Sequence, residues 1–465
     1  MKSLKKKFAQ INVTLAPKVN VNEKIVENAT CTFCGCVCDD ITLTVDTEKK
    51  VITKAKDACI LGKAWFLNHV IEDRPIARID GKEVTLDEAI EEAAQTLVNA
   101  KFPIVYGLSD TVCEAQRQIV PIVDDISGTV DTTTSVCHGP SGMAFQGVGE
   151  PSMTLGEVKN RADLVIYWGG NPAESHPRHF GRYAVTPEGM FTPNGKKDRT
   201  VVLVDVRKTK SAGVADMFIQ PKPGKDFELL WTLRLAVKGR KIPENTEEEI
   251  GVSKSQIEEL VKLMKSCQYG VLFFGMGLTM TRGKHFNSGA LLALATDLNE
   301  FTHFVAKPVR GHGNVTGADN VVSWQTGYPF GVNFSQGYPR FNPGEFTTVD
   351  TLSRGEADAA MIIASDPASN FPKPAIKHLK SKKCKVISLD TKETHTSVIA
   401  HVAIATSTYG INTGGTVYRM DDVPISLRPA FESPFPSDLE VLTKLRKRVR
   451  ELTFKTRKKM FSKKS

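Results

Sequence analysis

The sequence contains no apolar run that could cross a membrane. The longest runs, such as residues 269–278, fall far short of the roughly 20 residues that a transmembrane helix needs. The basic N-terminus also lacks a continuous apolar segment with a small-residue cleavage site, and it carries no twin arginine. We therefore expect neither a membrane span nor a secretory signal.

The body of the chain has no excess of basic residues over acidic ones, although the formal net charge is +9. Residues 444–465 contain eleven Lys or Arg against one Glu, and residues 1–24 contain six Lys against one Glu, which leaves the body at about −6. The body lacks the basic face interleaved with aromatic residues that is typical of nucleic-acid-binding domains. We expect no nucleic-acid partner, and we expect the tails to be solvated or to contact partner proteins.

The length and composition indicate a globular protein of several parts. A chain of 465 residues is too long for one ordinary core, so roughly two to four lobes are expected. Hydrophobic residues make up 41% and charged residues 24%, as in soluble proteins. The nine cysteines cluster as ligands do, and no secretory signal accompanies them. This combination predicts a reducing, cytoplasmic location.

Four of the nine cysteines lie within eight residues, in the stretch CTFCGCVCDD. With Cys36 omitted, the spacing is Cys31-x2-Cys34-x3-Cys38, and Cys59 follows after a further twenty residues. A tight triplet with one distant partner suits a 4Fe–4S cluster, because a short loop reaches three irons and a returning segment reaches the fourth. Zinc is an alternative, although structural zinc sites usually have two paired knuckles. Four unrelated buried cysteines are the third interpretation.

The pattern of apolar residues predicts an α/β fold. Residues 25–82 alternate short β-like runs with the cysteines, which indicates a small β-rich module. Residues 85–100 show helical spacing behind a Thr85 cap. Apolar strand candidates then alternate with helix-length segments, which predicts two Rossmann-like lobes with parallel sheets covered on both faces. The strand candidates are FPIVYG (102–107), ADLVIYWGG (162–170), RTVVLVDV (199–206), YGVLFFG (269–275), DAAMIIAS (358–365) and KVISLD (385–390).

Several of the predicted strands end in glycine or acidic residues. Ligands of parallel α/β sheets bind beyond the carboxyl ends of the strands, where glycines admit a phosphate and acidic residues accept hydrogen bonds from ribose or base. Each motif alone is equally compatible with a tight turn. Their repetition indicates a large nucleotide-like ligand, with candidate contacts at Gly169, Gly170, Asn171, Glu174, His176, Asp205, Arg207, Gly275, Gly277 and Asp366.

Two further segments carry candidate catalytic residues. Cys137 stands next to His138 among Gly, Pro and Ser residues. This setting favours a metal ligand or nucleophile beside a proton shuttle, with a structural turn as the alternative. Arg310 follows a strand-like run beside glycines, where a guanidinium could hold a carboxylate through two parallel hydrogen bonds. Considered alone, Arg310 is more readily interpreted as a surface residue.

The remaining signals are structural. Cys113, Cys267 and Cys384 have no His or Cys at ligand spacing and are predicted to be core residues. Residues 436–454 form a predicted amphipathic helix, because Ser437 and Glu440 make a capping box and Leu residues recur on one face behind it.

The motifs together resemble a known family. The cysteine motif, CHGPS, GGNPAESHP, VDVRKTKSAG, PKPGKD and RGHGNVTGAD occur in the order typical of molybdopterin oxidoreductases of the formate dehydrogenase kind. More narrowly, CTFCGCVCDDI, VCHGPSG and TGGTVYRMDDVPISLRP resemble the tungsten or molybdenum subunit of formylmethanofuran dehydrogenase, its B-type subunit. The resemblance covers roughly residues 25–452.

The resemblance implies a cofactor and roles for individual residues. The cofactor is a tungsten or molybdenum bis-pyranopterin guanine dinucleotide stretched across both lobes, with further contacts at Gly224 and Asp226. Cys137 is implied to be the thiolate ligand of the metal, His138 a proton relay and Arg310 the group that orients carbon dioxide or formate. Cys31, Cys34, Cys38 and Cys59 are implied to hold the 4Fe–4S cluster.

The implied reaction is the reversible reduction of carbon dioxide to formate, with electrons relayed by the cluster. Implied partners are an amidohydrolase-like subunit that condenses formate with methanofuran, a small molybdopterin-dinucleotide-binding subunit that supplies the C-terminal β-barrel missing here, and a polyferredoxin-type electron donor. The expected domains are a basic extension (1–24), the cluster module (25–82), a first Rossmann-like lobe (83–136 with 311–430), a second (137–310), and a C-terminal helix with a basic tail (431–465).

Some features depart from the family pattern or leave alternatives. Related formate dehydrogenases often carry a lysine where this chain has Leu61, so Lys63 is a candidate substitute at the cofactor. A formate dehydrogenase subunit is one alternative function. A cofactor-free scaffold of a formyltransferase/hydrolase complex is another, although such relatives have lost the cluster and metal cysteines that this chain keeps.

Overall fold

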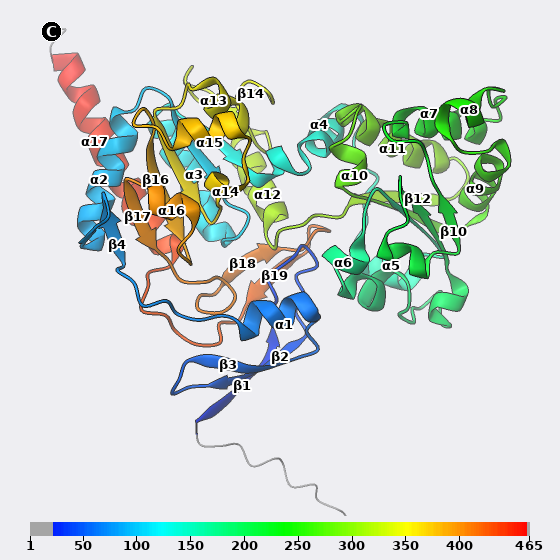
Figure 1. Cartoon of the computed structure of the whole chain (residues 1–465), viewed down its shortest axis with the longest axis horizontal. Helices are drawn as coiled ribbons and strands as arrows, with labels where there is room; N and C mark the ends of the chain where they lie inside the picture. Colours follow the sequence, from blue (N-terminus) through cyan, green and yellow to red (C-terminus); the bar gives the residue numbers. More distant parts are fainter. Residues whose placement is uncertain (1–21, 463–465) are drawn as a thin grey trace, which may run out of the picture.

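All six apolar segments predicted as strands form strands in the computed structural model, which describes residues 22–462. They divide between two sheets that lie side by side in Figure 1, each with helices packed on it. This arrangement confirms the mixed α/β fold. Most of the predicted extension at 1–24, and the end of the basic tail at 463–465, lie outside the described residues. Within the described part, no helix is both long and apolar enough to cross a membrane.

Three of the predicted strands, rich in Val, Leu and Ile, lie next to one another in a five-stranded sheet. Its order is β10-β9-β8-β11-β12, and all of its strand pairs are parallel. The carboxyl ends of the strands therefore meet at one edge of the sheet. The strands are β8 (Leu164–Trp168), β9 (Thr200–Val204), β10 (Met217–Ile219), β11 (Tyr269–Phe274) and β12 (His303–Pro308).

The other three predicted strands lie in a nine-stranded sheet of order β14-β13-β7-β6-β15-β16-β17-β4-β5. Its five central strands are parallel, and antiparallel pairs flank them on both sides. The strands are β4 (Ala77–Ile79), β5 (Lys82–Val84), β6 (Pro103–Gly107), β7 (Thr129–Thr132), β13 (Val332–Asn333), β14 (Arg340–Phe341), β15 (Ala359–Ile363), β16 (Lys385–Asp390) and β17 (Val402–Ala405). The domain boundaries given above stay a prediction.

Successive residues of the nine-stranded sheet face opposite cores, because side chains alternate along a strand. Val105 and Met361 share one core with α2 (Leu86–Asn99), α3 (Cys113–Asp125), α12 (Val315–Thr326) and α17 (Asp438–Ser462). Ile104 and Ile362 share the other with residues of α13 (Thr348–Arg354), α14 (Pro367–Asn370), α15 (Lys373–Leu379) and α16 (His395–Ile399). The predicted helix at 85–100 is thus confirmed as α2, with Thr85 as its cap.

The five-stranded sheet is covered in the same way. Ile166 and Leu272 face residues of α7 (Asp226–Val237), α9 (Lys254–Ser266) and α11 (His285–Leu298). Val165 and Val271 face α5 (Leu155–Arg161) and the cysteine module, which consists of β1 (Glu23–Ala29), β2 (Ile41–Asp46), β3 (Val51–Lys56) and α1 (Ile60–Leu67). The module therefore shares a core with this sheet, and Figure 1 shows it below the two sheets.

The C-terminal helix α17 begins at Asp438, where Ser437 and Glu440 make the predicted capping box. Its apolar face packs on α2 and α3 through Leu442 and Val449. The helix continues to Ser462, beyond the predicted end at residue 454. Before α17, the chain forms a hairpin of β18 (Gly415–Tyr418) and β19 (Pro424–Leu427).

Candidate functional site

The structure brings the four predicted cluster cysteines together. The loop between β1 and β2 carries Cys31, Cys34 and Cys38, and these thiols line one small cavity with Cys59. Cys59 caps α1, where its Sγ accepts a hydrogen bond from the backbone N–H of Gly62 (3.4 Å). A Cβ at Gly62 would lie 3.2 Å from the Cys31 Sγ. The absence of a side chain at Gly62 therefore leaves room for the thiols of Cys31 and Cys59. The short loop and the helix start therefore converge as predicted.

Two arginines lie behind the cysteine loop. Arg178 binds Asp40 through two hydrogen bonds, and Arg182 donates to Asp39 (2.6 Å). Burial raises the pKa of Cys38 to about 11, while the positive charges of Arg178 and Arg182 act in the opposite direction. The two arginines, which Asp40 and Asp39 hold in place, therefore partly compensate the negative charge of thiolates at this loop.

Cys36 lines the same cavity as the four predicted cluster ligands. It is 1% exposed and, like Cys31 and Cys38, lies in the core shared with the five-stranded sheet. Its hydrogen bond with Cys34 affects both thiols: the pKa of Cys36 is raised and that of Cys34 is lowered, chiefly through this bond. Cys36 is therefore placed to tune Cys34 by hydrogen bonding.

Cys137 lies at the end of a short 3₁₀ turn, η1 (Thr133–Val136), that follows β7. Burial raises the pKa of the Cys137 thiol to about 11, and the charge of Arg310 and the backbone amide of Gly311 act against this rise. Arg310 and Gly311 are therefore close enough to the Cys137 thiol to affect its pKa. The positive charge of Arg310 favours the thiolate form of Cys137, and the role of this cysteine stays a prediction.

His138 precedes α4 (Gly139–Val148) and is 1% exposed. Its Nδ1 lies 3.1 Å from the Ser141 hydroxyl, whereas its Nε2 is buried and has no partner among the described residues. Burial lowers the pKa of His138 to about 3, and the charge of Arg310 acts in the same direction, so the imidazole is neutral. The backbone of Val309 acts in the opposite direction. A buried nitrogen without a protein partner is open to a bound group or to a water molecule.

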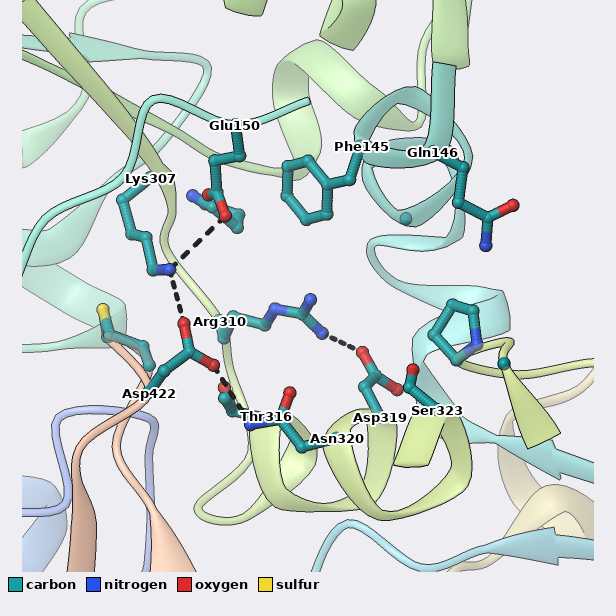
Figure 2. A pocket seen from close by; sticks show the side chains of 15 residues that line it. Phe145, Gln146, Glu150, Lys307, Arg310, Thr316, Asp319, Asn320, Ser323 and Asp422 are labelled. Atoms are coloured by element: carbon teal, nitrogen blue, oxygen red, sulfur yellow. Dashed lines mark hydrogen bonds and ion pairs between the residues drawn. The ribbon is translucent and has the colours of Figure 1, made fainter. Parts of the chain in front are cut away.

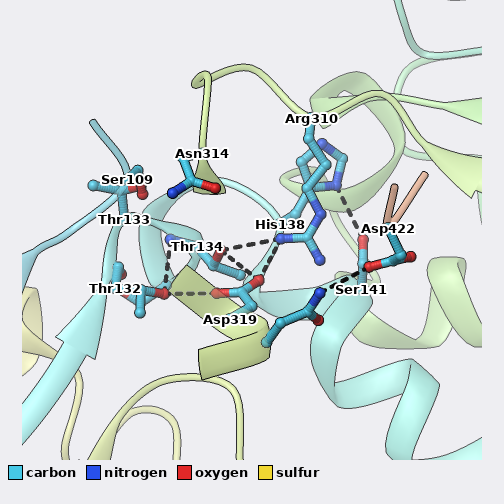
Figure 3. Close-up of polar contacts among 12 residues, drawn as sticks. Ser109, Thr132, Thr133, Thr134, His138, Ser141, Arg310, Asn314, Asp319 and Asp422 are labelled. Atoms are coloured by element: carbon cyan, nitrogen blue, oxygen red, sulfur yellow. Dashed lines mark hydrogen bonds and ion pairs between the residues drawn. The ribbon is translucent and has the colours of Figure 1, made fainter. Parts of the chain in front are cut away.

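Arg310 follows β12 and is only 8% exposed, so the interpretation as a surface arginine is wrong. Its Nη1 donates to Asp319 and to the Thr134 hydroxyl (3.2 Å), as Figure 3 shows. Asp319, on α12, also accepts from the hydroxyls of Thr132 (2.9 Å) and Thr134 (2.8 Å). Thr132 and Thr134 flank the start of the turn that ends at Cys137. One buried network therefore joins Arg310 to the turn that holds Cys137.

A cavity of about 350 Å³ opens beside this network. Figure 2 shows the Arg310 guanidinium within it, with Glu150 and Lys307 on the other side. The Lys307 ammonium is buried and binds Asp422 (2.7 Å) and the Ser152 hydroxyl (2.8 Å). Sequence reasoning missed Glu150, Asp319 and Asp422 as site residues. Asp319 and Lys307 did lie in the segment KPVRGHGNVTGAD, so their proximity to Arg310 was the available signal.

The strand-end residues lie mostly around the five-stranded sheet. Gly169, with φ +57°, packs against Gly275 and Gly277 so closely that a Cβ at Gly169 would collide with the backbone of the facing loop. The Gly277 N–H donates to the Gly169 carbonyl (2.8 Å). These glycines are required for the approach of two loops. Beyond the carboxyl ends of the same sheet lie Gly170, Asn171, Glu174, His176, Asp205, Arg207, Gly224 and Asp226.

Some of these side chains already have protein partners. Asp226 accepts from the Trp168 indole (2.8 Å), and Glu174 pairs with Lys210 (2.7 Å). Asp366 lies apart, beyond β15 of the other sheet, where it accepts from Thr396. Most of the predicted contact residues therefore lie at the five-stranded sheet, whereas Asp366 lies at the nine-stranded sheet. Lys63 is exposed on α1, and its role stays a prediction.

The chain is similar to curated proteins over most of its length. It is 44% identical to the B-type subunit of tungsten-containing formylmethanofuran dehydrogenase 2 from Methanocaldococcus jannaschii, over 92% of this chain and 99% of that protein. It is 43% identical to the protein of the same name from Methanococcus maripaludis, over 92% and 100%. Formate dehydrogenase H of Escherichia coli is 27% identical over 83% of this chain and 62% of that protein. None of the protein-family models compared with the chain matches it.

Two solved structures share the fold. The formyltransferase/hydrolase complex FhcABCD from Methylorubrum extorquens, solved with methylofuran, contains a chain that aligns with a TM-score of 0.65 and 23% identity, over 81% of this chain and 99% of that chain. Acetylene hydratase from Pelobacter acetylenicus aligns with a TM-score of 0.67 and 12% identity, over 92% and 70%. At these identities the likeness supports the fold alone.

Proposed function

The chain belongs to the family of B-type, tungsten-containing subunits of formylmethanofuran dehydrogenase, an oxidoreductase, and we propose that it carries the metal centre at which carbon dioxide and formate are interconverted. The observation that carries this proposal is the single buried network that ties Arg310 to the turn of Cys137, beside a histidine with an unpartnered nitrogen. A carboxylate-binding cation, a thiol and a neutral imidazole are the groups that this chemistry needs.

We propose that Cys31, Cys34, Cys38 and Cys59 hold a 4Fe–4S cluster. Their shared cavity and the space left by Gly62 support this assignment. Structural zinc sites usually have two paired knuckles, whereas a tight triplet with one distant cysteine suits the separated corners of a cubane cluster. The spacing of the cysteines therefore favours the cluster over zinc.

We propose that the Cys137 thiolate is the protein ligand of tungsten or molybdenum in a bis-pyranopterin guanine dinucleotide. Such a centre, when bound, would supply the two-electron chemistry between carbon dioxide and formate, with single electrons relayed by the cluster. The unpartnered Nε2 of His138 fits a missing neighbour of this kind. The strand-end residues of both sheets are the proposed contacts of the pterin dinucleotide.

Arg310 is suited to hold a small carboxylate. Its Nη1 binds Asp319 and Thr134, so Nε and Nη2, for which the described residues provide no hydrogen-bond partner, remain for the substrate. We propose His138 as the proton relay: as a neutral imidazole it has one ring nitrogen without a proton, at which it can accept one and then pass it on. The Asp319 anchor keeps the guanidinium from turning away.

We further propose that the chain works in a cytoplasmic complex. The relatives are named as one subunit of several, which supports partners for the remaining steps. The proposed partners are an amidohydrolase-like subunit, a small molybdopterin-dinucleotide-binding subunit and a polyferredoxin-type electron donor. None of the nine cysteines, all of which lie within residues 22–462, forms a disulfide, which supports a reducing compartment.

Metal analysis of the native complex, combined with Cys137→Ala, tests the proposal. The complex should contain tungsten or molybdenum together with at least about four irons per copy of this chain, since an iron–sulfur donor subunit adds irons of its own. The variant should lose formate oxidation and keep the electron paramagnetic signal of the reduced cluster. Full activity in the variant would remove Cys137 from the metal, and a native complex without tungsten or molybdenum would favour the scaffold function instead.

A further inference from the structure

The cysteine loop lies directly on the loop that carries Arg310. The backbone N–H of Gly35, between Cys34 and Cys36, donates to the Gly311 carbonyl (3.0 Å). A Cβ at Gly35 would collide with the Arg310 carbonyl oxygen, so only glycine fits there. The Gly35 carbonyl in turn accepts from the Met420 N–H of the β18–β19 hairpin (2.9 Å), which holds the loop from the other side. Close packing of backbone on backbone leaves little freedom to either loop.

His176 holds the same carbonyl from another direction. Its Nε2 lies 2.6 Å from the Arg310 carbonyl oxygen, and its Nδ1 lies 2.8 Å from the Ser175 hydroxyl. A carbonyl only accepts, so Nε2 carries the proton and donates it to the Arg310 carbonyl. Nδ1 is then an acceptor, which shares the single hydroxyl proton of Ser175 with the Asn171 carbonyl (3.0 Å). His176 is 2% exposed, and burial lowers its pKa to about 4, so the ring stays neutral. Both ring nitrogens are therefore engaged by protein groups, which leaves neither for the cofactor contact predicted from the sequence.

Arg310 is thus fixed at both ends. Its carbonyl is held by His176 and packed against Gly35, and its Nη1 is held by Asp319 and Thr134. The side chain between these anchors lies in the cavity (Figure 2). Neither His176 nor Gly35 lines that cavity. Each of them contacts the site through the backbone of Arg310.

We propose that His176 and Gly35 are positioning residues that fix the carbonyl of Arg310 and so set the line along which its guanidinium enters the cavity. This inference rests on the proposed role of Arg310 as the group that binds the carboxylate. It reassigns His176 from the cofactor to the arginine loop. It also means that the loop of the proposed cluster ligands is a structural support of the substrate site.

The test compares variants in the complete complex, with KM and kcat for formate, tungsten content and the cluster signal measured for each. His176→Leu should raise KM about tenfold and change kcat less than about twofold, because a lost hydrogen bond leaves the carbonyl free to move. His176→Gln should restore most of the loss, since its amide can donate from nearly the same point. Gly35→Ala should also raise KM, while the cluster signal persists.

Matched controls separate position from general damage. His378 makes the same kind of contact, with its Nε2 2.6 Å from the Ala357 carbonyl, far from this site, so His378→Leu should leave KM unchanged. Gly289 lies on α11 with open space around it, so Gly289→Ala should behave as wild type.

The outcomes also separate this inference from the proposed function. If Arg310→Ala leaves KM unchanged, the proposed role of Arg310 fails. If Arg310→Ala raises KM but His176→Leu does not, the positioning role fails alone. Loss of tungsten in His176→Leu at unchanged KM would return His176 to the cofactor. In an Arg310→Ala background, His176→Leu should have no further effect on KM, and an additive effect would overturn the inference.

Discussion

Replacing Asp319 by Asn removes the anchor of Arg310 while keeping the shape of the side chain. Asp319 is 5% exposed and accepts hydrogen bonds from Thr132, Thr134 and Arg310. Asparagine offers one acceptor oxygen and a donor amide. If the oxygen serves Thr132, the amide faces the donors of Arg310 and Thr134, so the guanidinium loses its carboxylate in a buried site.

The expected cost follows from these bonds. A hydrogen bond to a charged group contributes about 1.5–3 kcal/mol and a neutral one about 1 kcal/mol. Breaking a buried ion pair by removing one partner costs about 3–5 kcal/mol, because the remaining charge is left without compensation. We therefore expect Asp319→Asn to lower the free energy of unfolding by about 3 kcal/mol and to raise KM for formate, because the guanidinium loses its orientation.

Denaturant unfolding and steady-state kinetics of the complex measure both effects. Asp297→Asn is the matched control, because Asp297 pairs with Arg234 (2.7 Å) and Lys238 (2.9 Å) on the helical face of the five-stranded sheet, away from the cavity. The control should lose stability and keep its KM. Wild-type stability and KM in Asp319→Asn would refute the anchoring role, and an equal rise of KM in both variants would show that the effect is not local.

Three further predictions test other parts of the chain. Cys38→Ser should abolish the cluster signal, whereas Cys36→Ser should keep it with an altered spectrum; the reverse result would contradict the ligand assignment. Gly169→Ala should lower the unfolding free energy by at least about 2 kcal/mol in a denaturant titration, because of its φ of +57° and the collision with the facing loop, whereas Gly170→Ala, with no atom closer than 3.6 Å, should cost much less. Burial raises the pKa of Asp390 from 3.8 to about 7, so the folded state binds this proton more tightly than the unfolded state, and wild-type stability falls as the pH rises through this range. The stability gained by Asp390→Asn should therefore grow by about 2–3 kcal/mol between pH 5 and pH 8 in thermal or chemical unfolding, and a pH-independent difference would contradict the shift.

Local elements could be predicted because their signals are contained in short segments. The strand at 269–275 and the helix at 85–100 show their periodicity and cap within a dozen residues, and both occur as expected. Cys113 and Cys384 are buried as predicted, whereas Cys267 is only partly buried. The order of strands in the nine-stranded sheet could not be predicted in this way, because β7 pairs with β13, which lies more than 200 residues further along the chain.

The same distinction applies to the candidate site: contacts between segments close in sequence could be predicted, and contacts between distant segments could not. The cysteine spacing predicted convergence correctly, because a loop and a helix start close in sequence decide it. The Arg310 network was not predictable, since Thr134 and Asp319 reach Arg310 from different elements and 176 residues separate Thr134 from Arg310. For His176, the strand-end position predicted a cofactor contact, whereas the fold shows that its ring faces a backbone carbonyl.

The position of the cysteine module follows from its lack of a separate core. Its buried residues, such as Cys36 and Ile41, share one hydrophobic core with Tyr167 and Phe273 of the five-stranded sheet. Separating the module from that sheet would expose this core, so the distance between the proposed cluster and the Arg310 loop is set by packing and not by a flexible linker. Gly35 adds a backbone contact at the point of closest approach. Electron delivery and substrate binding therefore depend on the same packed interface, so a core substitution such as Phe273→Ala should impair both at once.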